Sequence, residues 1–107
     1  GDVGTGAIEA AKENGKYAIG VDRDQNDIAP ENILTSAMKK VNEGVFNVVK
    51  DLSEGNFDGG KTLVFGLKED GIGLAPSTDK NVPQDVIDYV NDQIEKITSG
   101  EIVVPNK

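Results

Sequence analysis

Helical segments with one apolar face alternate with short apolar runs along this chain, and the alternation restricts the folds that it can adopt. Apolar residues recur at helical spacing over 38–52 and again over 86–97. Short apolar runs bounded by glycine and polar residues, typical of buried strands, lie at 16–21, 61–65 and 101–105. Because parallel neighbours need a crossover helix between them, the pattern predicts an α/β layer fold with a mainly parallel sheet.

Shorter elements fill the rest of the chain, and glycine or proline bounds them. Gly15 and Gly100 are placed to end helices in the left-handed conformation, and Pro83 suits the first turn of the last helix. The triplet 58–60 is a turn signal before the run 61–65. The other predicted elements are a helix over 5–14, a loop over 26–32, a strand or helix start over 33–36 and a strand over 72–75.

Composition removes several classes of function. The 107 residues fit one small domain, with a net charge of -8 and neither Cys nor His. A nucleic-acid site needs a basic stripe that this chain lacks, so nucleic acid is not an expected partner. Without thiol or imidazole, most catalytic and zinc sites are excluded, and we expect no enzyme, no metal and no cofactor. Gly1 opens the sequence without a signal segment, as at a cloning or processing boundary.

Two carboxylates stand at the exit of the first predicted strand. Asp22 and Asp24 follow the run 17–21, and ligands of open α/β sheets bind outside the carboxyl ends of strands. One carboxylate has two acceptor oxygens and can receive both hydroxyl protons of a vicinal diol, as in ribose. The alternative interpretation is that both aspartates solvate the strand end or cap a turn.

Glycines near the start of the chain are a second candidate feature. Gly4 and Gly6 are expected to precede the first helix, where free amide N–H groups can approach a polar ligand. With Asp22 roughly 20 residues downstream, the pattern imitates a dinucleotide fingerprint. Glu9 stands where the third glycine belongs, and no strand precedes the glycines. A nucleotide-cofactor enzyme fragment is therefore kept only as an alternative.

Lysines supply the candidate cations. Lys39 and Lys40 are expected to begin the helix that contains Val41, where the positive end of the helix dipole disfavours them. A lysine at this place could donate to a ligand hydroxyl or pair with Asp22, or it could simply be solvated. The oxygen-rich segment 22–27 lacks the glycine and terminal glutamate of a calcium loop.

Several blocks of this sequence, taken in order, match one known family. They resemble its glycine-rich turn and helix, its IGVDxDQ strand, and its LTSxxK, GLKDGGVGLA and ISGEIKVP segments. The family is that of the bacterial basic membrane proteins, solute-binding lipoproteins whose characterised members capture purine nucleosides for an ABC importer. The matching blocks are 4–12, 17–25, 34–39, 66–75 and 97–105.

The resemblance implies a fold and a set of ligand residues. Residues 1–107 would be a single α/β segment, the C-terminal third of a two-lobed type-1 periplasmic-binding protein that closes on its ligand. Asp22 and Lys39 would hold the ribose hydroxyls, and Gly4 and Gly6 would add backbone contacts. Asp24 is the second choice for the carboxylate.

The resemblance also implies partners and a location. The ligand would be a purine nucleoside or a similar small polar molecule, and the protein partner an ABC transporter permease. The protein would be extracytoplasmic, held at the membrane only through a lipid anchor upstream of this segment. An autonomous regulatory or protein-interaction domain of the same family is the alternative function.

The aromatic residues that stack the base in this family are absent from the matching motifs. We therefore expect the segment alone to bind weakly or not at all, because stacking contributes on the order of 1 kcal/mol or more for each contact. Exposed sheet edges or apolar faces would favour self-association. The aromatic residues of the chain are Tyr17, Phe46, Phe57, Phe65 and Tyr89.

Overall fold

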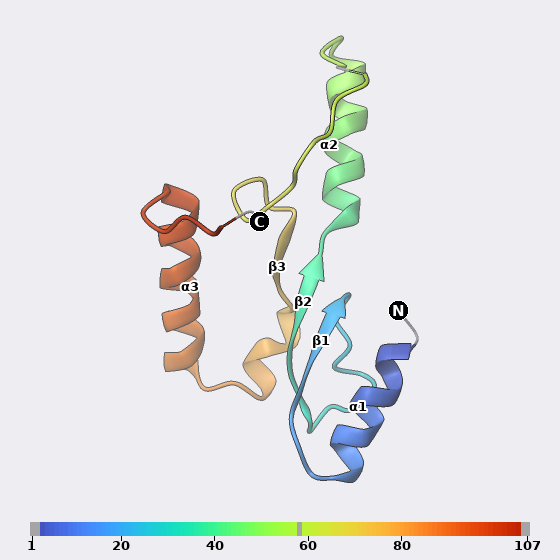
Figure 1. The fold of residues 1–107 in the computed structure, drawn as a ribbon, viewed down its shortest axis with the longest axis vertical. Coiled ribbons are helices and arrows are strands. Elements are labelled where there is room, and N and C mark those ends of the chain that lie inside the picture. The colour runs from blue at the N-terminus through green and yellow to red at the C-terminus, as the bar shows by residue number, and fades with distance from the viewer. Residues whose placement is uncertain (1–2, 58, 106–107) are drawn as a thin grey trace.

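The computed structural model describes residues 3–57 and 59–105 (Figure 1). Three helices, one 3-10 helix and a three-stranded sheet make up the regular structure of the described residues. The elements are α1 (Val3–Glu13), β1 (Ala18–Asp22), β2 (Ile33–Lys39), α2 (Val41–Ser53), β3 (Ile72–Leu74), the 3-10 helix η1 (Pro76–Lys80) and α3 (Gln84–Ser99).

The sheet has the strand order β1-β2-β3. β1 and β2 are parallel, with Ala18 opposite Ile33 and Asp22 opposite Met38. β3 is antiparallel to β2, with Ile72 opposite Lys39. The α/β class with helices flanking a sheet is confirmed. The sheet is mixed, because the chain returns from α2 through a turn and enters β3 in the opposite direction.

A small core lies where α1 covers β1 and the loop before β2. Ile8 of α1, Ala29 and Ile33 are buried and form one cluster, against which Ala18 and Ile28 pack. Ile33 is fully buried, so one apolar side chain from α1, one from the loop before β2 and one from β2 meet at this point. Removal of these groups from water is the main stabilising term that the sequence can offer here.

The rest of the described chain is open. Neither α2 nor α3 contains a buried residue, and α2 extends beyond the sheet (Figure 1). The radius of gyration is 16.6 Å, against about 13 Å for a compact domain of this length. The apolar stripe predicted along α2 is therefore present but uncovered by described residues. No described helix has the length and apolar character needed to cross a bilayer.

Several expected elements differ from those observed. Residues 61–65 and 101–105 are irregular, because a strand needs a neighbour to take its backbone bonds and none of the described strands pairs with them. The first helix begins at Val3, so Gly4 and Gly6 lie inside it and do not form a preceding turn. Glycine is tolerated in a first turn, where the N–H groups lack intrahelical partners. The turn signal 58–60 falls partly outside the described residues.

Gly20 makes the close approach of β1 and β2 possible. Gly20 and Ser36 are opposite each other in the sheet, and both are buried. A Cβ atom on Gly20 would lie 2.3 Å from the Ser36 Oγ atom and 2.9 Å from Gln25 Oε1. Gln25 folds over this strand, so only glycine leaves room for its side chain.

We expect Gly20→Ala to lower the free energy of unfolding by about 1–3 kcal/mol, because overpacking forces neighbouring groups to move. Gly44→Ala, in α2, is the matched control. A Cβ there would make ordinary contact with Phe65 at 3.9 Å, and alanine should raise the free energy by up to about 1 kcal/mol through helix propensity. Urea unfolding of both variants checks these opposite signs. Equal effects of the two substitutions would contradict the packing argument.

Candidate functional site

The two residues expected to bind ligand lie at neighbouring strand ends. Asp22 is the last residue of β1 and Lys39 the last residue of β2. Because these strands are parallel, their carboxyl ends meet at one edge of the sheet. Asp22 and Lys39 line one groove of about 400 Å³ there, and both are exposed. The structure therefore brings this pair together beside a shared cavity.

The opposite wall of this groove comes from later parts of the chain. Val90 and Ile94 of α3 line it together with Leu67 and Ile72. None of the described residues that line the groove is aromatic. Phe65 lines an adjacent groove of about 500 Å³ along α2, and Lys39 and Ile72 line that groove too. The Asp22 groove thus offers a polar mouth and an aliphatic wall, without a ring to stack a base.

Asp22 has an unusual backbone conformation. Its φ angle is 73°, in the left-handed region that non-glycine residues seldom adopt. The Arg23 amide donates to the Val21 carbonyl oxygen at 3.0 Å, which closes a three-residue γ-turn with Asp22 at its centre. The positive-φ form of this turn is rare and strained. Strain of this kind persists only where surrounding contacts hold it, and it concentrates at ligand sites.

Gln25 fastens the loop back onto the sheet. Its side-chain Oε1 atom accepts from the Val21 amide at 2.9 Å, and its own amide donates to Ser36 Oγ at 3.1 Å. Sequence reasoning assigned no role to Gln25 or Ser36. A signal was present in the sequence, since a glutamine shortly after a strand with Gly20 has space to fold over it.

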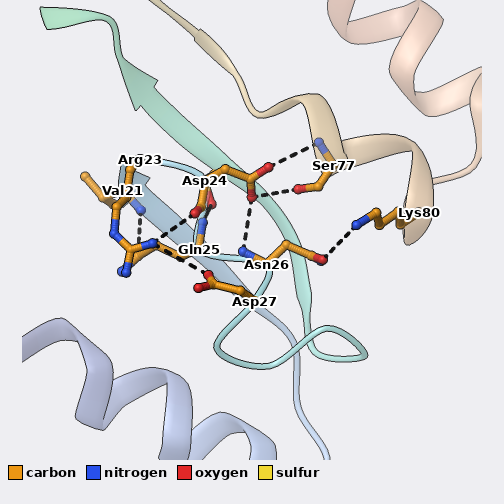
Figure 2. A network of polar contacts seen from close by, with 9 residues as sticks. Val21, Arg23, Asp24, Gln25, Asn26, Asp27, Ser77 and Lys80 are labelled. Carbon is orange, nitrogen blue, oxygen red and sulfur yellow. Dashed lines mark hydrogen bonds and ion pairs between the residues drawn. The ribbon is translucent and has the colours of Figure 1, made fainter.

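Asp24 is engaged within the protein. Figure 2 shows its carboxylate pointing toward Ser77, the second residue of η1. Asp24 Oδ1 accepts from Ser77 Oγ at 2.7 Å and from the Asn26 amide at 3.1 Å, while Oδ2 accepts from the Ser77 amide at 3.3 Å. These bonds, the Ser77 hydroxyl foremost, lower the pKa of Asp24 below its ordinary value. The second-choice ligand therefore serves as an internal tie.

The two lysines occupy different positions from those expected. Lys39 ends β2, and Lys40 precedes α2 as its N-cap residue, so neither lies in the helix. Strand pairing with Ile72 extends β2 through Lys39 and delays the helix. The Lys40 ammonium pairs with Asp70, which offsets the unfavourable helix dipole. Lys39 forms no ion pair within 3–57 and 59–105 and is available to a ligand.

The two glycine candidates lie apart from Asp22. Gly4 lines a separate groove of about 450 Å³ between α1 and β1. Val21 lines both this groove and the one that contains Asp22. The start of α1 is thus near the same sheet edge, but Gly4 and Gly6 do not line the Asp22 groove.

The conformation of Asp22 predicts a stability change opposite to that of most substitutions. Asp22→Gly should raise the free energy of unfolding by about 1 kcal/mol, because glycine adopts positive φ without strain. Asp22→Ala should lower it by about 1 kcal/mol, since alanine lacks the tolerance of aspartate for this region. Thermal or urea unfolding measures both. Destabilisation by Asp22→Gly would contradict the strained turn.

The tie of Asp24 predicts a pH effect. A carboxyl group with a lowered pKa in the folded state stabilises that state above its unfolded pKa of about 4, and loses this contribution as the pH falls through the folded pKa. We expect Asp24→Asn to destabilise the chain most near neutral pH, with a smaller difference from wild type near pH 3. Urea unfolding at both pH values checks this. A difference that grows toward acid would contradict it.

Comparison with known proteins identifies the kind of chain. Residues 1–107 match the family described as ABC transporter substrate-binding protein PnrA-like. Basic membrane protein D of Borreliella burgdorferi (strain JD1) is 44% identical over 108 residues, which cover 95% of this chain and 31% of that protein. Basic membrane protein A of Borreliella afzelii is 39% identical over 105 residues, with 95% and 32% covered. The chain thus spans about a third of the length of these relatives.

Solved structures agree in fold. The crystal structure of a transcriptional activator of the comK gene from Bacillus halodurans has a TM-score of 0.82 and 27% identity, covering 94% of this chain and 35% of that chain. A solute-binding protein of an ABC transporter system from Aeropyrum pernix K1 has a TM-score of 0.66 and 28% identity, covering 95% and 37%. With the family match over its whole length, the chain belongs to the PnrA-like ABC transporter substrate-binding proteins, a family of binding proteins and not of enzymes.

Proposed function

We propose that this chain supplies the sugar-binding edge of a nucleoside receptor that serves an ABC importer. The observation that carries the proposal is the position of Asp22 and Lys39, at the ends of adjacent parallel strands and beside one groove. An ionised carboxylate accepts two hydroxyl protons, and an ammonium group donates to the same hydroxyl oxygens. The pair therefore suits a vicinal diol on a neutral sugar.

The strained turn at Asp22 supports this assignment. A residue that only solvates a strand end gains nothing from a positive φ angle, which costs about 1–3 kcal/mol. Asp24 shows the purely structural alternative, since hydrogen bonds from Ser77 and Asn26 occupy its carboxylate. Within the described part of the chain, the Asp24 carboxylate is occupied by these hydrogen bonds, whereas no bond to the Asp22 carboxylate is seen, so Asp22 is the aspartate that can bind a ligand.

Part of the binding site is missing from the described groove. None of its described lining residues is an aromatic side chain that could stack a purine. We propose that the chain is the C-terminal third of a two-lobed protein, and that the remainder supplies the base site and the closing lobe. The importer permease, the lipid anchor and the extracytoplasmic location belong to this proposal for the whole protein.

A regulatory domain is the second candidate function. The comparison structure with the TM-score of 0.82 is that of a transcriptional activator. A net charge of -8 disfavours direct contact with DNA, so a regulatory chain of this kind would act through a protein partner. Saturable nucleoside binding that depends on Asp22 favours the receptor, whereas the regulatory function requires no such binding.

Calorimetric titration of guanosine into the full family-length chain tests the receptor proposal. Asp22→Asn is the sharpest substitution, because asparagine tolerates positive φ and removes only the charge. We expect Asp22→Asn and Lys39→Met each to weaken binding roughly tenfold to a hundredfold, the value of a hydrogen bond to a charged group. A 2′,3′-dideoxynucleoside should bind the wild-type protein more weakly than guanosine does, by a similar factor.

Two matched controls neutralise one carboxylate and one ammonium group that do not line the Asp22 groove. Asp27→Asn removes a carboxylate whose exposed side chain pairs only with Arg23 among the described ion pairs, and Lys50→Met removes an ammonium group from the last turn of α2. Both should leave affinity unchanged. Unchanged affinity in Asp22→Asn, or equal binding of the ribo and dideoxy compounds, would reject the diol mechanism.

A further inference from the structure

We propose that Asp24 is a positioning residue: it fastens the loop after β1 to η1 and thereby holds Asp22 in the turn that presents its carboxylate to the groove. The inference rests on the proposed function in treating Asp22 as the ligand group. It assigns to Asp24 an indirect role in binding that differs from the direct contact expected of a second aspartate in the same motif.

The turn at Asp22 needs restraint on both sides. With φ at 73° and the Arg23 amide bonded to the Val21 carbonyl, the turn is a high-energy conformation that relaxes unless its flanking residues are held. On the strand side, the Val21 amide is held by Gln25 Oε1. On the loop side, Arg23 is exposed, and among the described residues its guanidinium bonds within its own loop, to the Asp24 carbonyl and the Asp27 carboxylate.

On the loop side, the Gln25 amide is bonded to Ser36 Oγ, and Asp24 adds the restraint that joins the loop to η1. Its carboxylate joins the loop to Ser77, 53 residues further along the chain, through both the hydroxyl and the amide of that residue. Its bond with the Asn26 amide also fixes the shape of the loop itself. A second link to η1, from Lys80 Nζ to Asn26 Oδ1, is longer at 3.4 Å and joins an uncharged acceptor. The charge-assisted bonds of Asp24 are therefore the stronger of the two links.

The bonds between Asp24 and Ser77 also connect the loop to the part of the chain that leads into α3, which lines the same groove. η1 leads through residues 81–83 into α3, which supplies Val90 and Ile94 opposite Asp22. α3 has no buried residue of its own, and it follows directly on η1 and the short connection after it (Figure 1). Asp24 thus connects the Asp22 loop to the segment that leads into α3, and the bonds from Thr35 to Thr78 and from Asn81 to Ile33 hold that segment to the sheet as well.

The test uses Ser77→Ala, which removes the hydroxyl donor, and Asp24→Ala, which removes the acceptor, in the full family-length chain. The first readout is the intraresidue HN–Hα NOE of Asp22, measured with aspartate-selective labelling, which is strong only at positive φ. The second is the dissociation constant for guanosine. We expect both variants to weaken this NOE and to reduce affinity about tenfold, the effect of losing a hydrogen bond to a charged group.

Ile33→Val is the matched control for stability, since Ile33 is fully buried in the core and lines none of the grooves at the sheet edge. It should lower the melting temperature but leave the NOE and the affinity unchanged. This separates a positioning role from general loosening of the fold.

The outcomes distinguish the two proposals. A variant that keeps the NOE, or that loses it with no change in affinity for a nucleoside that the wild type binds, overturns the inference. If the wild type binds no nucleoside but the variants lose the NOE, the receptor proposal fails, and the hold of Asp24 on the Asp22 turn is still supported.

Discussion

Parallel pairing of β1 with β2 is the constraint on which the other features of this structure depend. It brings the carboxyl ends of two strands to one edge of the sheet, so that Asp22 and Lys39 line the same groove although 17 positions separate them in sequence. The pairing itself requires Gly20, which leaves space for Ser36 and Gln25. Gln25 and Asp24 then hold the loop that presents Asp22.

Much of this could be predicted from the sequence, because local patterns determine it. The amphipathic spacing of α2 and α3, Gly100 in the left-handed conformation at the end of α3, and the strand that ends at Asp22 all follow from residues close in the chain. The ranking of Asp22 above Asp24 came from the family resemblance and not from these local patterns. Its physical basis in the proposed site depends on Ser77, 53 residues downstream, whose hydroxyl bonds to Asp24.

The expectations that failed depend on pairing between distant segments. Apolar β-branched residues at 61–65 and 101–105 have the composition of strands, but no described strand is their neighbour, and they are irregular and largely exposed. The apolar stripe of α2 is exposed for the same reason, with more than half of the surface of Val45 and Val49 accessible. The chain spans about a third of the length of its relatives, and the proposed two-lobed receptor would give these exposed faces a partner.

The central claim is that Asp22 and Lys39, at the ends of neighbouring strands, bind the hydroxyl groups of a sugar. A crystal structure of the full family-length chain with a bound purine nucleoside tests it most directly. The account predicts both ribose hydroxyls within hydrogen-bond distance of the Asp22 carboxylate, with the Lys39 ammonium beside them and Asp24 still bonded to Ser77. A nucleoside whose ribose lies elsewhere, or is held by Asp24 with Asp22 turned into solvent, would contradict it.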